Sequence, residues 1–367
     1  MAPDSAEVVV VGGGAMGASV ACHLARLGVT DVVLLERDSL ASGSTSKAAG
    51  GIRAQFADEL NVRIALRSMA EFERLEEADG IGYRRNGYLF LLDSEPDLER
   101  FRAACDLQQA LGVPSELLSP AEAGELVPQL ETGDLVGATF CALDGVAAPE
   151  AVVQAWAREA AERGVHVLQA TALVGIDVCE GVIESVETTS GRIRTGTVVC
   201  TAGVWSREVG ALAALEIPVA GEPRWTHFTP EDGGLPDALP LTIDFSTGFY
   251  LHREGQGLVF GGRETTIDEL AVPAVRRLPA LAELPVQSSW WGYYEMSPDH
   301  NAIVGEAREP GRFLYATGFS GHGFQQSPAV GEHLAELVAG REPTLDLSPF
   351  ALERFAGDEE RREHFVV

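Results

Sequence analysis

Three glycines near the N-terminus have the spacing of a loop that holds a phosphate. Gly12, Gly14 and Gly17 follow a short apolar run at 8–11 and precede a helical pattern at 18–27. In such a loop the first glycine permits a tight turn, the second lets the backbone approach a pyrophosphate, and the third lets the helix pack on the strand. The free N–H groups of the helix N-terminus attract the phosphates. These residues predict a dinucleotide site.

The next apolar run supports this prediction. Residues 31–35 read as a second strand, which ends at Glu36. A carboxylate at this position can accept hydrogen bonds from both ribose hydroxyls and would repel a 2′-phosphate. Glycines that served only a tight turn would leave Glu36 without a role. Strand, glycine turn, helix and strand together form a βαβ unit with parallel strands.

Two further segments decide between a nicotinamide and a flavin dinucleotide. Residues 42–53 are mostly small or hydroxylated, contain the single lysine of the chain, Lys47, and end at Arg53. Such a run can pass close to phosphates and a flat ring. A second glycine-rich loop, Gly318–Gln325, lies near the C-terminus. Because a nicotinamide enzyme normally keeps its Rossmann unit continuous, the two segments favour FAD and redox chemistry on a small molecule.

The remaining patterns predict two intertwined domains. We expect a discontinuous FAD-binding domain at 1–80, 150–217 and 300–367, and a substrate-binding domain at 81–149 and 218–299. The fold class is a Rossmann-like α/β domain interrupted by an α+β domain with a mixed, largely antiparallel β-sheet. Further helices are expected at 59–77, 96–111, 149–163 and 328–338, and strands at 165–168, 172–178, 182–188 and 192–199.

Composition excludes several classes of protein. The formal net charge of −28 repels nucleic acid and anionic membranes. No run of 18 or more apolar residues indicates a membrane span, and the N-terminus lacks a basic region before its apolar run, so a cytoplasmic protein is expected. The five cysteines are widely spaced, which supports neither a disulfide framework nor a metal site.

With these motifs in place, the chain resembles the D-amino acid oxidase superfamily of flavoproteins. Within it, the chain is most similar to the branch of monomeric sarcosine oxidase, glycine oxidase and proline dehydrogenase β-subunits. The resemblance extends over about residues 7 to 340 and is specific for the family but not for a substrate. The segments that carry it are 10–17, 44–53, 198–205, 294–299 and 318–325.

The resemblance implies a non-covalent FAD site. It places Gly12, Gly14 and Gly17 at the pyrophosphate, Glu36 at the adenosine ribose, and the backbone of Leu173 at the adenine. The part of the second glycine-rich loop at 321–324 passes under the isoalloxazine ring, where a helix beginning at Pro328 would further stabilise negative charge. The other residues that it places along the cofactor are Ala15, Met16, Arg37, Ser44, Thr45, Ser46, Lys47, Gly50, Gly51, Ala202, Gly203, Trp205, Gly318, Gly321, His322, Gly323, Phe324 and Gln325.

On the substrate side, the resemblance implies that Arg53 clamps a carboxylate above the flavin, for which a guanidinium fork is suited. A solvated or phosphate-paired arginine is the alternative. Tyr294 and Tyr250 are expected to line the substrate, although aromatic residues here could equally be core packing. Arg263 could bind a second anionic group of a larger or dicarboxylic substrate. The other interpretation is an ordinary surface arginine. His322 is expected to position the ring rather than act as a base.

Three positions depart from the sarcosine oxidase pattern. Gln325 stands where that enzyme has a second, lysine clamp, which weakens the case for a simple amino acid. Val259 replaces the lysine thought to activate oxygen, which favours a dehydrogenase; compensation by Lys47 is the alternative. Gly292 replaces the cysteine that anchors the flavin covalently, so the FAD should be dissociable.

The leading hypothesis is oxidation of the C–N bond of a secondary or cyclic amino acid, sarcosine- or proline-like, by hydride transfer to flavin N5, giving an imine. A 2-hydroxy acid dehydrogenase is the first alternative, and would need a base such as His252 or His322. A non-catalytic FAD-binding assembly factor or subunit is the second. The electron acceptor is unknown, and a monomer, a homodimer and a hetero-oligomer all remain open.

Overall fold

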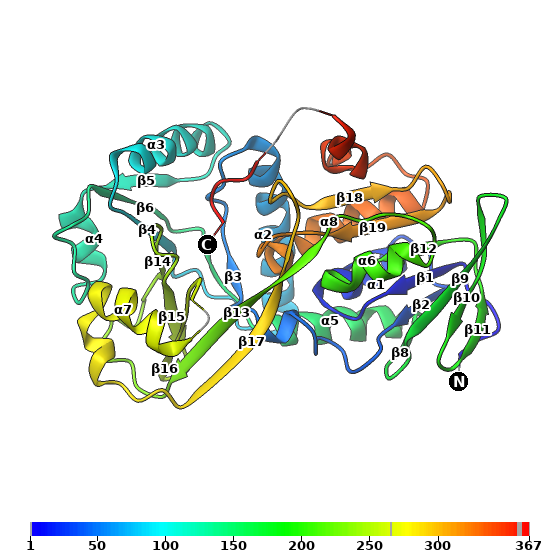
Figure 1. Cartoon of the computed structure of the whole chain (residues 1–367), viewed down its shortest axis with the longest axis horizontal. Coiled ribbons are helices and arrows are strands. Elements are labelled where there is room, and N and C mark those ends of the chain that lie inside the picture. Colours follow the sequence, from blue (N-terminus) through cyan, green and yellow to red (C-terminus); the bar gives the residue numbers. More distant parts are fainter. Residues whose placement is uncertain (1, 265, 358–361, 367) are drawn as a thin grey trace.

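The computed structural model describes residues 2–264, 266–357 and 362–366, which form two large sheets (Figure 1). The first sheet has six strands. Its strands are parallel except for the edge pair β18–β19. In spatial order they are β18 (Ile303–Glu306), β19 (Phe313–Thr317), β12 (Val198–Cys200), β1 (Val8–Val11), β2 (Val32–Leu35) and β8 (His166–Leu168).

Layers cover both faces of this parallel sheet. Val8 and Val10 of β1 pack into the core under the helices, while Val9 and Val11 pack into a core on the opposite face. This burial on both faces explains why the strands are uninterrupted apolar runs. The helices are α1 (Ala15–Arg26), α2 (Glu59–Asp79), α5 (Pro149–Glu162) and α8 (Gly323–Val338). The opposite face carries α6 (Ser206–Ala211) and a meander of β9 (Leu173–Cys179), β10 (Val182–Thr188) and β11 (Gly191–Arg194).

The second sheet has eight strands and is antiparallel except for the pair β14–β4. In spatial order they are β17 (Ser288–Met296), β13 (Ala220–Thr229), β16 (Gly257–Gly261), β15 (Tyr250–Glu254), β14 (Leu241–Asp244), β4 (Tyr88–Leu92), β6 (Gly137–Cys141) and β5 (Ser115–Leu118). Helices α3 (Glu95–Ala110), α4 (Pro120–Leu126) and α7 (Ile267–Arg277) accompany this sheet, and β3 (Gly51–Ile52) pairs with β7 (Gly145–Val146). The expected mixed, largely antiparallel sheet is confirmed.

The strand expected at 192–199 is two strands in different sheets, so that prediction was wrong. The hydroxyl of Thr195 accepts a hydrogen bond from the backbone N–H of Thr197 at 3.2 Å and donates to the Thr197 carbonyl at 3.1 Å. This local turn redirects the chain from the meander to the parallel sheet.

The last long helix begins at Gly323 and not at Pro328, which lies inside α8. A proline removes one N–H from the helical ladder and leaves the carbonyl four residues earlier without its partner. Here that carbonyl belongs to Phe324, and the hydroxyl of Ser327 donates to it at 2.7 Å. The Ser327 hydroxyl replaces the missing N–H donor, so the helix can begin within the second glycine-rich segment, at Gly323.

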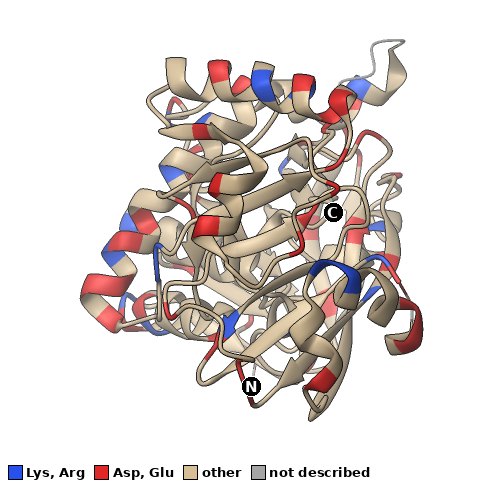
Figure 2. Ribbon diagram, turned by 90° about the vertical axis from the view of Figure 1, so that its left-hand side faces the viewer, with Lys and Arg blue, Asp and Glu red and all other residues tan. Residues whose placement is uncertain are grey.

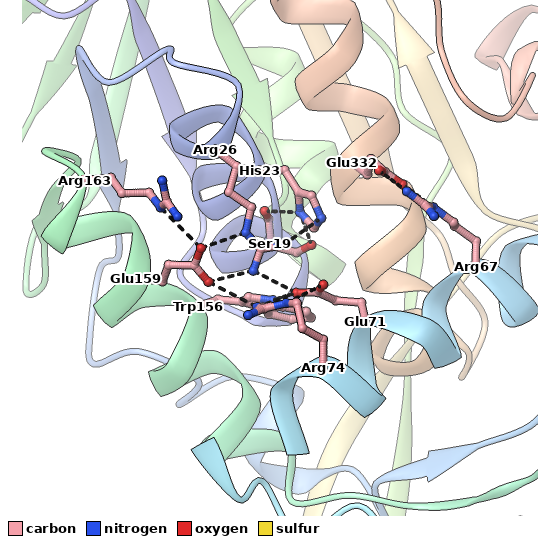
Figure 3. A network of polar contacts seen from close by, with 10 residues as sticks. All are labelled: Ser19, His23, Arg26, Arg67, Glu71, Arg74, Trp156, Glu159, Arg163 and Glu332. Carbon is pink, nitrogen blue, oxygen red and sulfur yellow. Dashed lines mark hydrogen bonds and ion pairs between the residues drawn. The ribbon is translucent and has the colours of Figure 1, made fainter. Parts of the chain in front are cut away.

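A polar network joins α1 to α2 and α5 (Figure 3). Arg26 of α1 contacts Glu159 of α5 at 2.7 Å and Glu71 of α2 at 2.9 Å. The indole N–H of Trp156 and the guanidinium of Arg74 also donate to Glu71. These interactions fix the helix that follows the first glycine loop against its neighbours.

Acidic residues are spread over the outer helices with basic residues between them (Figure 2), in keeping with the acidic composition. Within the described ranges, no helix is long and apolar enough to cross a membrane.

Candidate cofactor and substrate site

A cavity of about 730 Å³ extends from the carboxyl ends of β1, β2 and β12 to the large antiparallel sheet. This is the edge at which open α/β sheets bind their ligands. The cavity brings together most of the residues expected along FAD, and two expected at the substrate. Those that line it are Gly12, Gly14, Ala15, Met16, Glu36, Arg37, Ser44, Thr45, Lys47, Leu173, Ala202, Gly203, Trp205, Tyr250, Tyr294, Gly321, Gly323 and Phe324.

In the first glycine loop, backbone atoms of neighbouring residues lie so close to Gly12 and Gly17 that no side chain could be accommodated. Gly12 has a φ of +108°, and a Cβ there would lie 2.5 Å from the Thr201 carbonyl oxygen. A Cβ on Gly17 would lie 1.8 Å from the Gly12 carbonyl oxygen. Gly17 therefore permits the close packing of α1 on the loop and does not itself line the cavity. The hydroxyl of Thr45 accepts from the N–H of Ala15 at 3.1 Å, which ties the second cofactor segment to the start of α1.

The residues after β2 form one wall of the cavity, where the adenosine is expected. The carboxylate of Glu36 accepts from the backbone N–H groups of Gly13 and Asp38, both at 2.8 Å, and so is held at the cavity wall. The guanidinium of Arg37 lies 3.8 Å above the ring of Trp205, a cation–π contact that closes the wall between β2 and β12.

The segment at 42–53 is attached to the edge strand β17. The hydroxyl of Ser44 donates to the carbonyl of Tyr293 at 2.8 Å, and Trp290 donates to the carbonyl of Lys47 at 3.2 Å. A Cβ on Gly292 would lie 2.5 Å from the Lys47 Cβ, so the glycine makes room for the lysine at the cavity wall. None of the described lining residues is a cysteine.

Several expected cofactor residues lie outside the cavity lining. The Ser46 hydroxyl donates to backbone carbonyls of its own turn. Gly50 and Gly51 permit close approach to the Ala147 carbonyl and the Tyr88 hydroxyl. Gly318, with a φ of +69°, packs on neighbouring side chains. These residues support the shape of the loops.

Arg53, expected to bind the substrate carboxylate, is buried, 3% exposed, and does not line the cavity. Its Nη2 donates to the carbonyl of Phe365 at 2.6 Å and to Nε2 of His322 at 2.9 Å, while Nη1 donates to the carbonyl of Gln55. Its backbone N–H donates to the side-chain oxygen of Gln325 at 2.8 Å. The structure thus brings Arg53, His322 and Gln325 together, as a cluster behind the cavity wall.

The protonation state of this cluster follows from its burial. Burial lowers the pKa of His322 well below its ordinary value, and the positive charge of Arg53 lowers it further. Since a guanidinium only donates, Nε2 of His322 must accept, which places the ring proton on Nδ1. His322 is a neutral ring that holds Arg53 in place.

Tyr250 and Tyr294, both expected at the substrate, line the part of the cavity that lies against the large antiparallel sheet. The hydroxyl of Tyr250 lies 3.2 Å from the hydroxyl of Thr226, and the guanidinium of Arg224 lies 5.1 Å above the ring of Tyr294. Burial raises the pKa of both tyrosines, more than nearby Arg224 lowers it, so both are neutral phenols. Arg224 and Thr226 line the cavity, and the sequence analysis missed them, although their alternation on β13 places them on one face.

Glu295 also lines the cavity and was missed. Its carboxylate accepts from the hydroxyl of Thr317 at 2.9 Å, and burial raises its pKa to about 7. The segment at 294–299 was recognised as a motif, but nothing in the sequence showed that this carboxylate would be turned inward beside Gly203 and Gly323.

The other candidate residues lie elsewhere. Arg263 is exposed and donates to the carbonyl of Val366 at 3.3 Å, beside a smaller cavity of about 360 Å³. His252 is buried, its Nδ1 lies 3.0 Å from the Arg253 carbonyl, and burial lowers its pKa to about 4. Val259 is buried in β16. Within the described residues, no cluster of three or more His, Cys, Asp or Glu side chains could hold a metal.

Comparison with known proteins identifies the family. Residues 7–337 match the family described as FAD dependent oxidoreductase (DAO). Mitochondrial sarcosine dehydrogenase of Mus musculus is 31% identical over 383 residues, which cover 96% of this chain and 42% of the relative. The chain therefore spans less than half the length of that relative.

Solved structures agree over nearly the whole chain. The L-proline dehydrogenase from P. horikoshii has a TM-score of 0.91 and 32% identity, with 97% of this chain and 99% of that chain covered. Glycine oxidase from Geobacillus kaustophilus has a TM-score of 0.86 and 25% identity, with 96% and 99% covered. These similarities confirm the fold class, and the match over residues 7–337 shows that the chain belongs to the DAO family of FAD-dependent oxidoreductases.

Proposed function

We propose that the protein oxidises the C–N bond of a small secondary or cyclic amino acid, sarcosine- or proline-like, to an imine. The observation that carries the proposal is the continuity of one cavity, which begins at the glycine loop of β1 and ends between Tyr250 and Tyr294. A cofactor held by the loops would present its reactive end to a substrate between these phenols. FAD held in this cavity would supply the acceptor for the hydride of the carbon next to nitrogen.

The chain's own residues supply orientation. Burial raises the pKa of Tyr294, and the positive charges of Arg224 and Arg53 oppose that rise. The charge of Arg53 therefore acts in the region where the substrate carboxylate would lie. The hydrogen bonds from Arg53 to Phe365 and Gln55 fix the guanidinium, and a fixed cation orients a carboxylate with little loss of entropy. We propose that the positive charge of Arg53 orients the substrate carboxylate and that the hydroxyls of Tyr250 and Tyr294 contact the substrate.

An amine in its neutral form needs no base, and this fits the composition of the cavity. No histidine is among the residues that line it in the described parts of the chain. His252 and His322, the bases that a 2-hydroxy acid would need, both lie outside the lining and have lowered pKa values. The relatives with sarcosine and proline in their names also act, by those names, on secondary amines.

Two positions, 259 and 47, bear on whether oxygen or another compound accepts the electrons. Val259 is a buried apolar residue of β16, so no cation stands at the place of the oxygen-activating lysine. Lys47 does line the cavity, and it is the residue to examine if the protein reacts rapidly with oxygen. We propose a dehydrogenase with dissociable FAD, located in the cytoplasm, that passes its electrons to another acceptor.

Anaerobic flavin reduction tests the proposal. The FAD-loaded protein is mixed with sarcosine, L-proline, primary amino acids and 2-hydroxy acids in turn, and the visible flavin absorbance is followed before and after air is admitted. We expect bleaching by a secondary amine and slow recovery in air. Bleaching by hydroxy acids alone would replace the proposal with the 2-hydroxy acid reading, and no bleaching by any compound would favour a non-catalytic role.

A further inference from the structure

We propose that the smaller cavity and Arg224 form a subsite for a second carboxylate of the substrate, remote from the reacting C–N bond. The preferred substrate would then be a secondary amino acid with two carboxylates. This inference rests on the proposed amine oxidation and adds the substrate class. It begins from the fact that Arg224 lines both the cofactor cavity and the smaller cavity.

The strand β13 connects the two cavities. Thr226, Arg224 and Glu222 alternate along it and therefore share one face of the sheet. Thr226 lines the large cavity and Glu222 the smaller one, with Arg224 between them. Residues two apart on a strand are separated by about 7 Å. A substrate that reacts beside Tyr250, the hydrogen-bond partner of Thr226, would need only a few carbon atoms to reach the guanidinium.

Arg224 is held in place but incompletely paired. Its side chain is 13% exposed, and Nη1 donates to the carboxylate of Glu222 at 2.7 Å and to the Pro223 carbonyl at 3.3 Å. The ring of Tyr294 lies beneath the guanidinium. Nε is buried without a hydrogen-bond partner in the described part of the chain. A buried, unpaired N–H of a cation is costly unless a ligand accepts from it, and a carboxylate is suited to this planar donor.

The surroundings of Arg224 also favour an anion. Although the chain carries a formal charge of −28, the smaller cavity gathers two further arginines, Arg263 and Arg362. Their clustering at one opening raises the local concentration of anions.

The two carboxylates in the lining are already engaged by the protein. Glu222 pairs with Arg224, and Glu363 accepts from the N–H of Phe365 at 2.8 Å. Burial raises the pKa of Glu363 to about 7, against the opposing effect of Arg53. Arg263, predicted from sequence as a second anionic anchor, lies in this cavity and fits the same role.

Binding of unreactive acids tests the subsite without turnover. The FAD-loaded protein is titrated with glutarate, butyrate and inorganic phosphate, and binding is read from the perturbation of the flavin spectrum. We expect glutarate to bind about tenfold more tightly than butyrate, as one additional charge-assisted contact would provide. R224Q should abolish this preference and leave butyrate affinity unchanged within about twofold.

Two further variants control for a nonspecific loss of the preference for glutarate. R192Q removes the same charge from an exposed position on β11 and should keep the preference for glutarate. E222Q should strengthen glutarate binding, because it removes the carboxylate that competes for Arg224. This second effect keeps the proposal testable if R224Q does not hold FAD.

The outcomes separate the two proposals. Equal binding of glutarate and butyrate to the unmodified protein, or an unchanged preference in R224Q, would overturn the subsite. Phosphate binding as tight as that of glutarate would overturn the assignment to a carboxylate. A preference for glutarate that depends on Arg224, with no flavin reduction by any amine, would leave the subsite standing and refute the proposed oxidation instead.

Discussion

The guanidinium of Arg53 donates a hydrogen bond of 2.6 Å to the carbonyl of Phe365, and so joins the end of β3 to the C-terminal segment at 362–366. The ring of Phe365 stacks on Phe101 with centroids 4.0 Å apart and an interplanar angle of 9°. The segment is therefore part of the wall behind the substrate side, and the position of Arg53 depends on residues at the opposite end of the sequence.

Phe365→Ala tests this attachment. Phe365 is 1% exposed, and truncation of a buried phenylalanine costs about 3–5 kcal/mol of unfolding free energy. Urea unfolding of the purified protein measures the loss. His364→Ala, an exposed neighbour, is the matched control and should change stability by less than about 0.5 kcal/mol. Equal stability of the two variants would contradict the role of the segment.

Gly17→Ala tests the packing of α1 on the phosphate loop. The new Cβ would lie 1.8 Å from the Gly12 carbonyl oxygen, so the helix or the loop must move. Overpacking of this kind costs about 1–3 kcal/mol, and we expect FAD affinity to fall by about tenfold or more, measured by equilibrium dialysis. Gly196→Ala, where nothing lies within 4 Å, should retain FAD. Normal FAD affinity in Gly17→Ala would refute the argument.

The network around Arg26 predicts sensitivity to acid. Burial raises the pKa of Glu71, but hydrogen bonds from Arg74, Arg26 and Trp156 outweigh it and lower the pKa to about 2. Hydrogen bonding to Arg26 is the main cause that lowers the pKa of Glu159 to about 2. Because both folded pKa values lie below the ordinary 4.5, their stabilisation is present above pH 4.5 and is lost as the pH falls towards 2.

Arg26→Gln should destabilise the protein at neutral pH by about 2–3 kcal/mol, since the pairs are only partly buried. Arg63→Gln, which breaks an exposed pair with Glu59, should cost less than about 0.5 kcal/mol. Chemical denaturation as a function of pH measures both. The free energies of unfolding of Arg26→Gln and the parent protein should approach each other as the pH falls. A difference that stays constant on acidification would contradict the role of the network.

The carboxyl of Glu295 is expected to give the protein's stability the opposite pH dependence. Burial raises its folded pKa to about 7, above the unfolded value, so its contribution to stability is full below pH 4.5 and is lost as the pH rises through 7. Glu295→Gln cannot ionise, so the FAD-free variant should gain stability relative to the parent between pH 6 and 8. Thermal unfolding across this range is the measurement. Parallel curves for the two proteins would show that the carboxyl titrates normally.

Local patterns in the sequence determined the elements of the parallel sheet and of the helices that cover it. Runs such as 8–11 are apolar because both faces of a parallel strand are buried, and Gly12, Gly14 and Gly17 have few other uses at that spacing. Helices and strands whose periodicity is continuous were therefore predicted within a few residues of their bounds. The division at 195–197 and the start of α8 at Gly323 were not, because side-chain hydrogen bonds from Thr195 and Ser327 override local propensity.

The substrate side was decided by the tertiary structure. The sequence marked Arg53, Tyr250 and Tyr294 as candidates, but it did not show that a carbonyl from the C-terminal segment would meet Arg53, or that Arg224 would lie over Tyr294. These contacts join segments distant in sequence, and no local periodicity encodes them. The glycine loops expected to hold the cofactor are specified by short-range backbone geometry. The cavities proposed to select the substrate arise only where separate sheets and the segment at 362–366 pack together.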